Sequence, residues 1–210
     1  DLHSFPTRRS SDLRTLAVAL ESEYGEAFVS NVMDKAWKNY EKLISENKDE
    51  PKAMWVHTRE RIYPGIAIFN ALKEVDIERE KAVLLLKKYY LNRSEKVAGV
   101  IRRIMKIPGL YKRVPKFFAR MTPKQFGEAA GFQAEFYEQS KEMVRFDMLV
   151  CPYQYICQQY NCPEIVEMYC DADDVCYGNM HPKVQWLRTK TLGKGGDCCD
   201  FHVRISGNEK

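Results

Sequence analysis

The sequence lacks any long hydrophobic run. Its apolar segments, such as residues 82–86, fall far short of the roughly 20 residues that a helix needs to cross a bilayer. It also lacks internal repeats and low-complexity tracts, which argues against a solenoid or a fibrous protein. Of the 210 residues, 45% are apolar and 30% are charged, and the mean hydropathy is −0.48. We therefore expect a globular fold without a transmembrane helix.

Cysteine is missing from the first 150 residues, and all seven cysteines lie between Cys151 and Cys199. The odd count, with no secretion signal and no disulfide framework, favours reduced thiols and a cytoplasmic protein. A cluster as local as this predicts either buried core thiols or a metal or catalytic site in the last third of the chain.

An initial methionine is missing as well. The chain opens with DLHSFPTRRSSDL, residues 1–13, which looks like the in-frame translation of a sequencing-adapter oligonucleotide. Such translations occur at the ends of genes assembled from short reads, as in metagenomic data. We interpret the segment as an artefact, leave it out of the fold, and expect the biological protein to begin near Arg14.

Acidic residues are nearly absent between positions 81 and 124. This basic segment holds thirteen Lys or Arg residues and one acid, Glu95, although the whole chain has a net charge of only +4. Such a block is typical of solvated helix faces, but it also suits nucleic acid, an anionic membrane surface or a small anionic molecule. The sequence contains no helix-turn-helix, zinc-finger or common RNA-binding pattern. It therefore disfavours nucleic acid and leaves peripheral membrane contact through residues 81–124 as an alternative.

Helical periodicity dominates residues 14–130, where apolar residues recur at spacings of three and four. We expect interruptions at Pro64-Gly65 and at Pro115, because proline and glycine punctuate helices. The predicted helical segments are 15–45, a short one starting at Pro51, 66–75, 77–90, 95–107 and 110–119.

After Gly131 the apolar pattern alternates as in strands. The sequence predicts strands over 132–137, 143–150, 183–192 and 198–205, and short helices over 152–160 and 163–170. The glycine-rich turn at 193–197 closes the last two strands into a hairpin. The expected fold class is α+β, with a helical N-terminal half followed by an antiparallel sheet with short helices over 131–206, in one continuous domain.

The cysteine-rich part carries a combination of short motifs. They are Cys151-Pro152, Pro163-Glu164, Cys170-Asp171, Arg188-Thr189 and, after the glycine turn, Cys199-Asp200-Phe201. In this combination the chain resembles the L-2-amino-thiazoline-4-carboxylic acid hydrolase family over about residues 50–205. The glycine turn into Cys-Asp-Phe is also similar, over a shorter stretch, to 4-vinyl-reductase-type ligand-binding domains, some of which hold zinc through cysteines.

The first resemblance implies a hydrolase acting on the carbon–nitrogen bonds of a small anionic cyclic amidine. The named substrate is a five-membered thiazoline with an amino group and a carboxylate, which water opens toward N-carbamoyl-cysteine. The alternative is a non-catalytic small-molecule-binding or sensor domain that uses the same pocket and is zinc-containing in some versions.

Amidine hydrolysis needs a nucleophile, proton transfer and a cation for the substrate carboxylate. Cys199 is the candidate nucleophile, Asp171 the candidate general base, and His181 the candidate proton shuttle. Arg188 is predicted to bind the substrate carboxylate, because a guanidinium grips a carboxylate through two hydrogen bonds. Thr189 is its neighbour in the family-matching motif and is predicted to bind substrate with it.

These residues also have structural interpretations. Cys199 alternates with Phe201 on the apolar side of its strand, which equally predicts core packing. Arg188 could instead form a surface ion pair. We expect Asp173-Asp174 to cap a helix or face solvent, and we assign His57 no role.

Zinc binding is a further alternative, since Cys151, Cys170, His181 and Cys199 could supply four ligands if the fold brings them together. No CxxC pair occurs, so no zinc ribbon is predicted. A bound metal would activate water directly and relieve Cys199 of the nucleophilic role.

Overall fold

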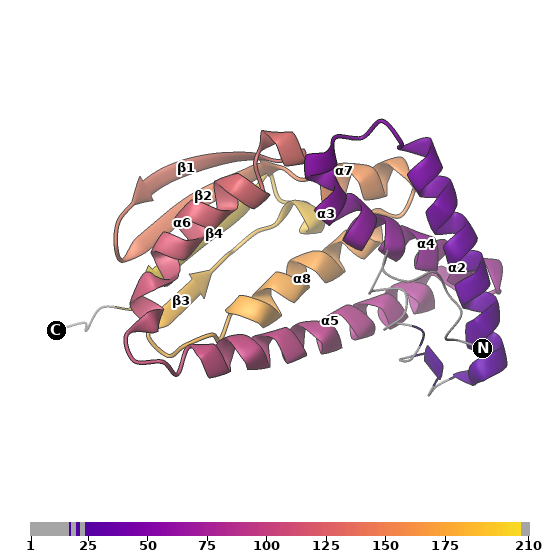
Figure 1. Ribbon diagram of the computed structural model, residues 1–210, viewed down its shortest axis with the longest axis horizontal. Helices are drawn as coiled ribbons and strands as arrows, with labels where there is room; N and C mark the ends of the chain where they lie inside the picture. The colour runs from indigo at the N-terminus through magenta and orange to yellow at the C-terminus, as the bar shows by residue number, and fades with distance from the viewer. Residues whose placement is uncertain (1–16, 18–19, 22–23, 207–210) are drawn as a thin grey trace.

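The computed structural model describes residues 17, 20–21 and 24–206. The expectation that residues 1–13 are an artefact lies outside the described residues. The observed architecture is α+β, with helices first and a four-stranded antiparallel sheet after them, as predicted (Figure 1). Among the described residues, no helix is both long enough and apolar enough to span a bilayer.

Two helices pack face to face in the N-terminal half. Helix α2 (Glu26–Glu46) starts after Gly25, whose φ of 80° is accessible to glycine at little cost. Its buried face, which includes Val32 and Ala36, lies on helix α4 (Tyr63–Glu74). This contact forms one of the two buried apolar clusters of the molecule.

The predicted break at Pro64-Gly65 is wrong. The chain passes through η1 (Lys52–Met54), α3 (Trp55–His57) and the π-helical turn η2 (Thr58–Ile62) directly into α4. Pro64 lies in the first turn of α4, where no backbone N–H is needed for a helical hydrogen bond.

Helix α5 (Arg79–Ile104) is continuous, so the prediction of separate helices at 77–90 and 95–107 is wrong. The polar residues between the two predicted helices include no proline or glycine, and Ser94 is buried in the middle of the helix. Gly109, with a φ of 75°, follows the helix and reverses the chain. This agrees with the prediction that the helical segment ends at residue 107, before Pro108-Gly109.

The predicted interruption at Pro115 is also wrong. After η3 (Leu110–Arg113), helix α6 (Val114–Gln125) carries Pro115 in its first turn, where proline is tolerated. A short turn, η4 (Glu128–Ala130), then leads into the sheet.

The sheet has the strand order β1-β2-β4-β3, with every neighbouring pair antiparallel. Its strands are β1 (Gln133–Gln139), β2 (Met143–Val150), β3 (Val184–Leu187) and β4 (Cys199–Ile205). Cys199, Phe201 and Val203 face the second buried cluster, as the alternation in β4 predicts, and α6 packs on this face (Figure 1). Strand β3 ends before Arg188, so it is shorter than predicted.

Two helices connect β2 to β3. Helix α7 (Pro152–Gln159) follows the predicted bounds closely, and η5 (Pro163–Ile165) leads into α8 (Val166–Tyr177), which runs beyond the predicted end at 170. Helix α8 lies along α5 and beside the end of β3 (Figure 1). The turn η6 (Leu192–Lys194) precedes β4 and closes this part of the fold.

Candidate functional site

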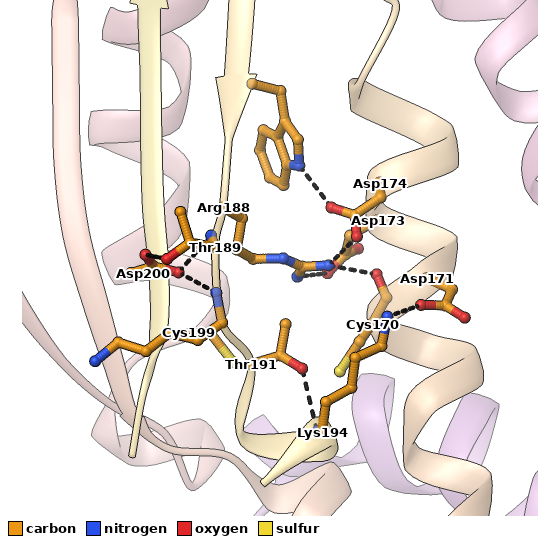
Figure 2. A network of polar contacts seen from close by, with 12 residues as sticks. Cys170, Asp171, Asp173, Asp174, Arg188, Thr189, Thr191, Lys194, Cys199 and Asp200 are labelled. Atoms are coloured by element: carbon orange, nitrogen blue, oxygen red, sulfur yellow. Dashed lines mark hydrogen bonds and ion pairs between the residues drawn. The ribbon is translucent and has the colours of Figure 1, made fainter. Parts of the chain in front are cut away.

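Arg188 reaches from the end of β3 to helix α8 (Figure 2). Its Nη2 donates a hydrogen bond to Asp174 Oδ2 at 2.6 Å and another to the Cys170 carbonyl oxygen at 2.7 Å. The side chain is only 2% exposed and lies over the ring of Phe201, with 5.1 Å between guanidinium carbon and ring centroid. The structure therefore places Arg188 inside the protein, with one side of its guanidinium already engaged.

Asp173 lies one helical turn after Cys170, and its Oδ2 is 3.8 Å from Nη1 of Arg188. Although 49% of its side chain is exposed, burial among protein atoms raises the pKa of Asp173 from 3.8 to about 6. The charge of Arg188 opposes this shift, and that of Asp174 adds to it. A carboxyl group with such a pKa can take up or release a proton near neutral pH.

A second arginine acts on the same carboxyl group. Arg61 lies in the π-helical turn η2, and its positive charge lowers the pKa of Asp173. Tyr169 donates a hydrogen bond from its hydroxyl to the Arg61 carbonyl oxygen at 3.1 Å, and Tyr40 does the same for Arg59 at 2.9 Å. Turns of this kind occur frequently at functional sites. Through this turn, the positive charge of Arg61 in the helical half acts on Asp173 of α8.

The turn η6 directs two backbone N–H groups at two thiols. Leu192 donates to Cys199 Sγ at 3.2 Å, and the N–H of Gly193 donates to the thiol of Cys170. The Thr191 hydroxyl also hydrogen-bonds with Cys170, and Figure 2 shows it between the two sulfur atoms. Hydrogen bonds from N–H groups favour the thiolate form of a cysteine.

Burial nevertheless keeps these thiols protonated. Desolvation raises the pKa of Cys199 to about 12, and it does the same for Cys151, which lies close enough to be affected by the charges of Cys170 and Cys199. The pKa of Cys170 is raised as well, again through burial. All seven cysteines are free. Because Cys199 packs with Phe201 in the sheet's buried cluster, the geometry favours its core-packing interpretation over an activated nucleophile.

Asp171 points away from this region and pairs with two lysines. Lys87 of α5 and Lys194 of η6 each place Nζ 2.6 Å from one of its carboxylate oxygens. Desolvation alone would raise the pKa of Asp171, but the hydrogen bonds from Lys194 and Lys87 hold it below its ordinary value. A carboxylate neutralised in this way is a weak general base, so its catalytic role stays a prediction that this geometry does not favour.

Thr189 is held by Asp200 of β4. Its hydroxyl donates to Asp200 Oδ2 at 2.6 Å, and the backbone N–H groups of Thr189 and Lys190 donate to Oδ1 at 2.9 and 2.8 Å. These hydrogen bonds fix the chain where it leaves β3. The Thr189 hydroxyl is thus engaged with the protein, and substrate binding through it remains a prediction.

His181 lies apart from the thiols. Its ring stacks on Tyr111 with 4.5 Å between centroids, and its Nδ1 accepts a hydrogen bond from the Lys183 N–H at 3.0 Å. The four candidate zinc ligands therefore do not converge. In the part of the chain that the structure describes, no group of three or more His, Cys, Asp or Glu side chains is arranged to hold a metal ion. The positions of these residues therefore give the zinc alternative no support.

Asp173 and Arg61 are the two candidates that sequence reasoning missed. Asp173 does not cap a helix, because it lies within α8, whereas the alternative that it faces solvent agrees with its half-exposed side chain. The sequence did contain a signal for Asp173, because Cys170, Asp173 and Tyr177 share one helical face at spacings of three and four. Arg61 gave none, since no apolar pattern announces a π-helical turn.

One surface recess of the described residues lies elsewhere. It has a volume of about 410 Å³, lies between the end of α6 and β1, and is lined by Phe126, Phe132 and Phe136 among others. None of the candidate residues lines it. Its lining includes one carboxylate, Glu128, but no arginine or lysine that could bind the substrate carboxylate, so we place the candidate site at Asp173 and Arg188.

Comparison with known families addresses the same part of the chain. The family model described as L-2-amino-thiazoline-4-carboxylic acid hydrolase matches residues 55–203, a range that runs from α3 into β4 and contains all the candidate residues. No curated protein matches the sequence. The family match covers well over half of the chain, in agreement with the resemblance carried by its cysteine-rich motifs. The chain belongs to the L-2-amino-thiazoline-4-carboxylic acid hydrolase family.

Proposed function

We propose that the protein is a cytoplasmic hydrolase that opens a small cyclic amidine bearing a carboxylate, of the L-2-amino-thiazoline-4-carboxylate type, to an N-carbamoyl product. Family membership supports the reaction class. The observation that carries the proposal is the Asp173 carboxyl group, which is half exposed, lies 3.8 Å from the Arg188 guanidinium and has a pKa of about 6. General bases work best when their pKa lies close to the working pH.

In this proposal Asp173 activates water. Its carboxylate removes a proton as the water oxygen bonds to the amidine carbon. Asp173 then passes this proton to the ring nitrogen, whose double bond to that carbon becomes single, and is ionised again. Collapse of the tetrahedral intermediate forms a carbonyl group and breaks the bond between this carbon and the ring sulfur. The hydroxyl proton passes to the sulfur through Asp173. One water is consumed, and the product is a urea with a free thiol.

These steps involve two different bonds of the substrate. Addition occurs at the carbon–nitrogen double bond of the amidine, but the bond that opens the ring is the carbon–sulfur bond. The substrate's carboxylate is attracted by the positive charges of Arg61 and Arg188, which both act at Asp173. The neutral thiols of Cys170 and Cys199 then form a wall of the site and are not nucleophiles.

A second candidate is a non-catalytic binding domain. It agrees with the raised pKa of Cys151 and Cys199, because binding needs no cysteine activated as a thiolate. A sensor would bind the same anionic amidine without consuming it. The two functions differ in turnover and not in affinity.

The test is to incubate the purified protein with L-2-amino-thiazoline-4-carboxylate and follow substrate and N-carbamoyl-cysteine by mass spectrometry. We expect turnover, a loss of at least about a hundredfold in kcat for Asp173→Asn, and little change for Asp171→Asn, the matched control on the same helix. Saturable binding without turnover would favour the sensor. Full activity of Asp173→Asn with loss in Asp171→Asn would return the base to Asp171.

A further inference from the structure

Helix α5 leaves a stripe of large apolar side chains uncovered over its C-terminal half. The stripe consists of Val97, Val100, Ile104 and Ile107, each between 44% and 56% exposed. Their spacing of three, four and three residues puts them on one side of the helix and its extension. The opposite side, which includes Ala98, is buried against the rest of the protein. The exposed stripe therefore has no role in packing the described fold.

Basic residues flank this stripe. Lys96 and Arg103 are exposed on the same side of α5, and Lys106 is exposed in the turn that follows. The only acid of the basic segment, Glu95, has its charge offset by Arg102 at 3.4 Å. The side of α5 that carries the apolar stripe thus has a strongly positive border.

The next helix extends the pattern. After the turn at Gly109 the chain continues into η3 and α6, beside the C-terminal end of α5 (Figure 1). Phe117 of α6 is 56% exposed, and Lys116 and Arg120 are exposed beside it. Apolar side chains among basic ones therefore recur on both sides of this turn.

We propose that the stripe and its basic border bind the surface of a bilayer containing anionic phospholipid, with Ile104 and Ile107 entering the headgroup boundary. An amphipathic helix with apolar residues on one side and Lys or Arg around them binds such interfaces through both forces. Each basic residue close to an anionic leaflet strengthens binding by about fivefold. The contact is independent of the hydrolase site, which lies on the side of α8 that faces β3.

The aliphatic character of the stripe distinguishes this partner from nucleic acid. Single-stranded nucleic acid is bound by aromatic side chains that stack on bases, together with positive charge. Valine and isoleucine offer bases no stacking surface, but they gain free energy when they leave water for lipid. A second copy of the chain would instead have to bring many like charges together, which electrostatic repulsion opposes.

The test is cosedimentation of the full chain with vesicles of phosphatidylcholine alone and of phosphatidylcholine mixed with phosphatidylglycerol. We expect binding to the mixed vesicles only, weakened by added salt. Ile104→Glu and Ile107→Glu should each reduce the partition coefficient by about tenfold or more. Arg103→Ser and Lys106→Ser should each reduce it by about fivefold.

The matched control is Leu84→Glu, which adds the same charge at an exposed leucine on a different side of α5. It should leave vesicle binding unchanged apart from the small electrostatic loss. Equal loss in Leu84→Glu, or no binding to the mixed vesicles, would overturn the proposal. Binding to single-stranded RNA that Arg103→Ser and Lys106→Ser weaken, in a protein that does not bind vesicles, would assign the surface to nucleic acid. Thermal unfolding of each variant, with Ile104→Ser as a milder substitution, excludes misfolding as the cause.

Discussion

Arg188 and Asp174 form a 2.6 Å ion pair between the end of β3 and helix α8. The other carboxylate oxygen of Asp174 accepts a hydrogen bond from Trp186 Nε1 at 2.9 Å, so this one aspartate holds two residues of the β3 region. Its neighbour Asp173 makes only a longer ion pair with Arg188, 3.8 Å between Oδ2 and Nη1. Of these adjacent aspartates, Asp174 holds the Arg188 side chain in place, and Asp173 remains accessible to a small molecule.

Arg188→Lys should destabilise the protein, because an ammonium group cannot reach Asp174 and the Cys170 carbonyl together from this buried position. We expect a loss of about 1–3 kcal/mol in the free energy of unfolding, measured by urea denaturation. Turnover should fall as well, mainly through a higher KM. Arg113→Lys, at an exposed position of η3, is the control and should leave both quantities unchanged. An unaffected stability in Arg188→Lys would mean that the pair does not hold β3 to α8.

Cys199→Ser should separate packing from chemistry. Its thiol is neutral, with a pKa of about 12, and it lies in the buried cluster of the sheet. A serine there can still accept the hydrogen bond from Leu192, but its own hydroxyl proton has no assigned acceptor. We expect a loss of about 1–3 kcal/mol in stability and retention of turnover below the lowered melting temperature. Turnover that vanishes at unchanged stability would instead identify Cys199 as nucleophile.

The pH dependence should follow Asp173. As a general base it is active when ionised, so kcat/KM should rise as pH increases through about 6, and Asp173→Asn should remove this step together with most of the activity. Stability should change in the opposite direction. A carboxyl group whose folded-state pKa is raised from 3.8 contributes stability below that value and loses it as pH rises through about 6.

Unfolding curves measured between pH 4 and pH 8 can check this sign. Asparagine resembles the neutral acid, so Asp173→Asn should gain stability relative to the wild type as pH rises. A constant difference between the two proteins would show that Asp173 titrates in its ordinary range, and the proposed base would lose its physical support.

Local patterns in the sequence located all four strands, although they placed the end of β3 too late. The alternation in β4 predicts which side of the strand holds Cys199 and Phe201, because the side-chain period of a strand is two residues regardless of its partners. The helix interruptions predicted at the prolines were wrong for an equally local reason. Pro64 and Pro115 both lie in first helical turns, which tolerate proline, and the apolar pattern does not locate a helix start to within two residues.

The candidate site was only partly predictable, because it depends on contacts between distant segments. Arg188 was identified by its motif, but its partner Asp174 lies 14 residues earlier on another element, with no pattern to connect them. The desolvation that raises the pKa of Asp173 depends on tertiary packing, which no local spacing encodes. Sequence reasoning therefore chose Asp171, the family-matching aspartate, which the fold pairs with two lysines.

Gly65 of α4 should tolerate no side chain, because a Cβ there would lie 2.2 Å from the hydroxyl oxygen of Tyr169. That hydroxyl donates to the Arg61 carbonyl oxygen, so Gly65→Ala should displace Tyr169 and disturb the π-helical turn that carries Arg61. We expect a loss of about 1–3 kcal/mol in the free energy of unfolding, together with reduced turnover.

The control for this substitution is Gly99→Ala in helix α5. A Cβ at Gly99 meets no atom within 4 Å, so alanine there should stabilise the protein by about 0.5–1 kcal/mol through its higher helix propensity. Urea denaturation and turnover of both variants, compared with the wild type, check the pair. If Gly65→Ala matched Gly99→Ala in stability, Tyr169 could move at no cost, and its hydrogen bond would not be what holds Arg61 beside Asp173. If Gly65→Ala lost stability but kept full turnover, the turn would matter for folding alone, and the attraction of the substrate carboxylate would rest on Arg188.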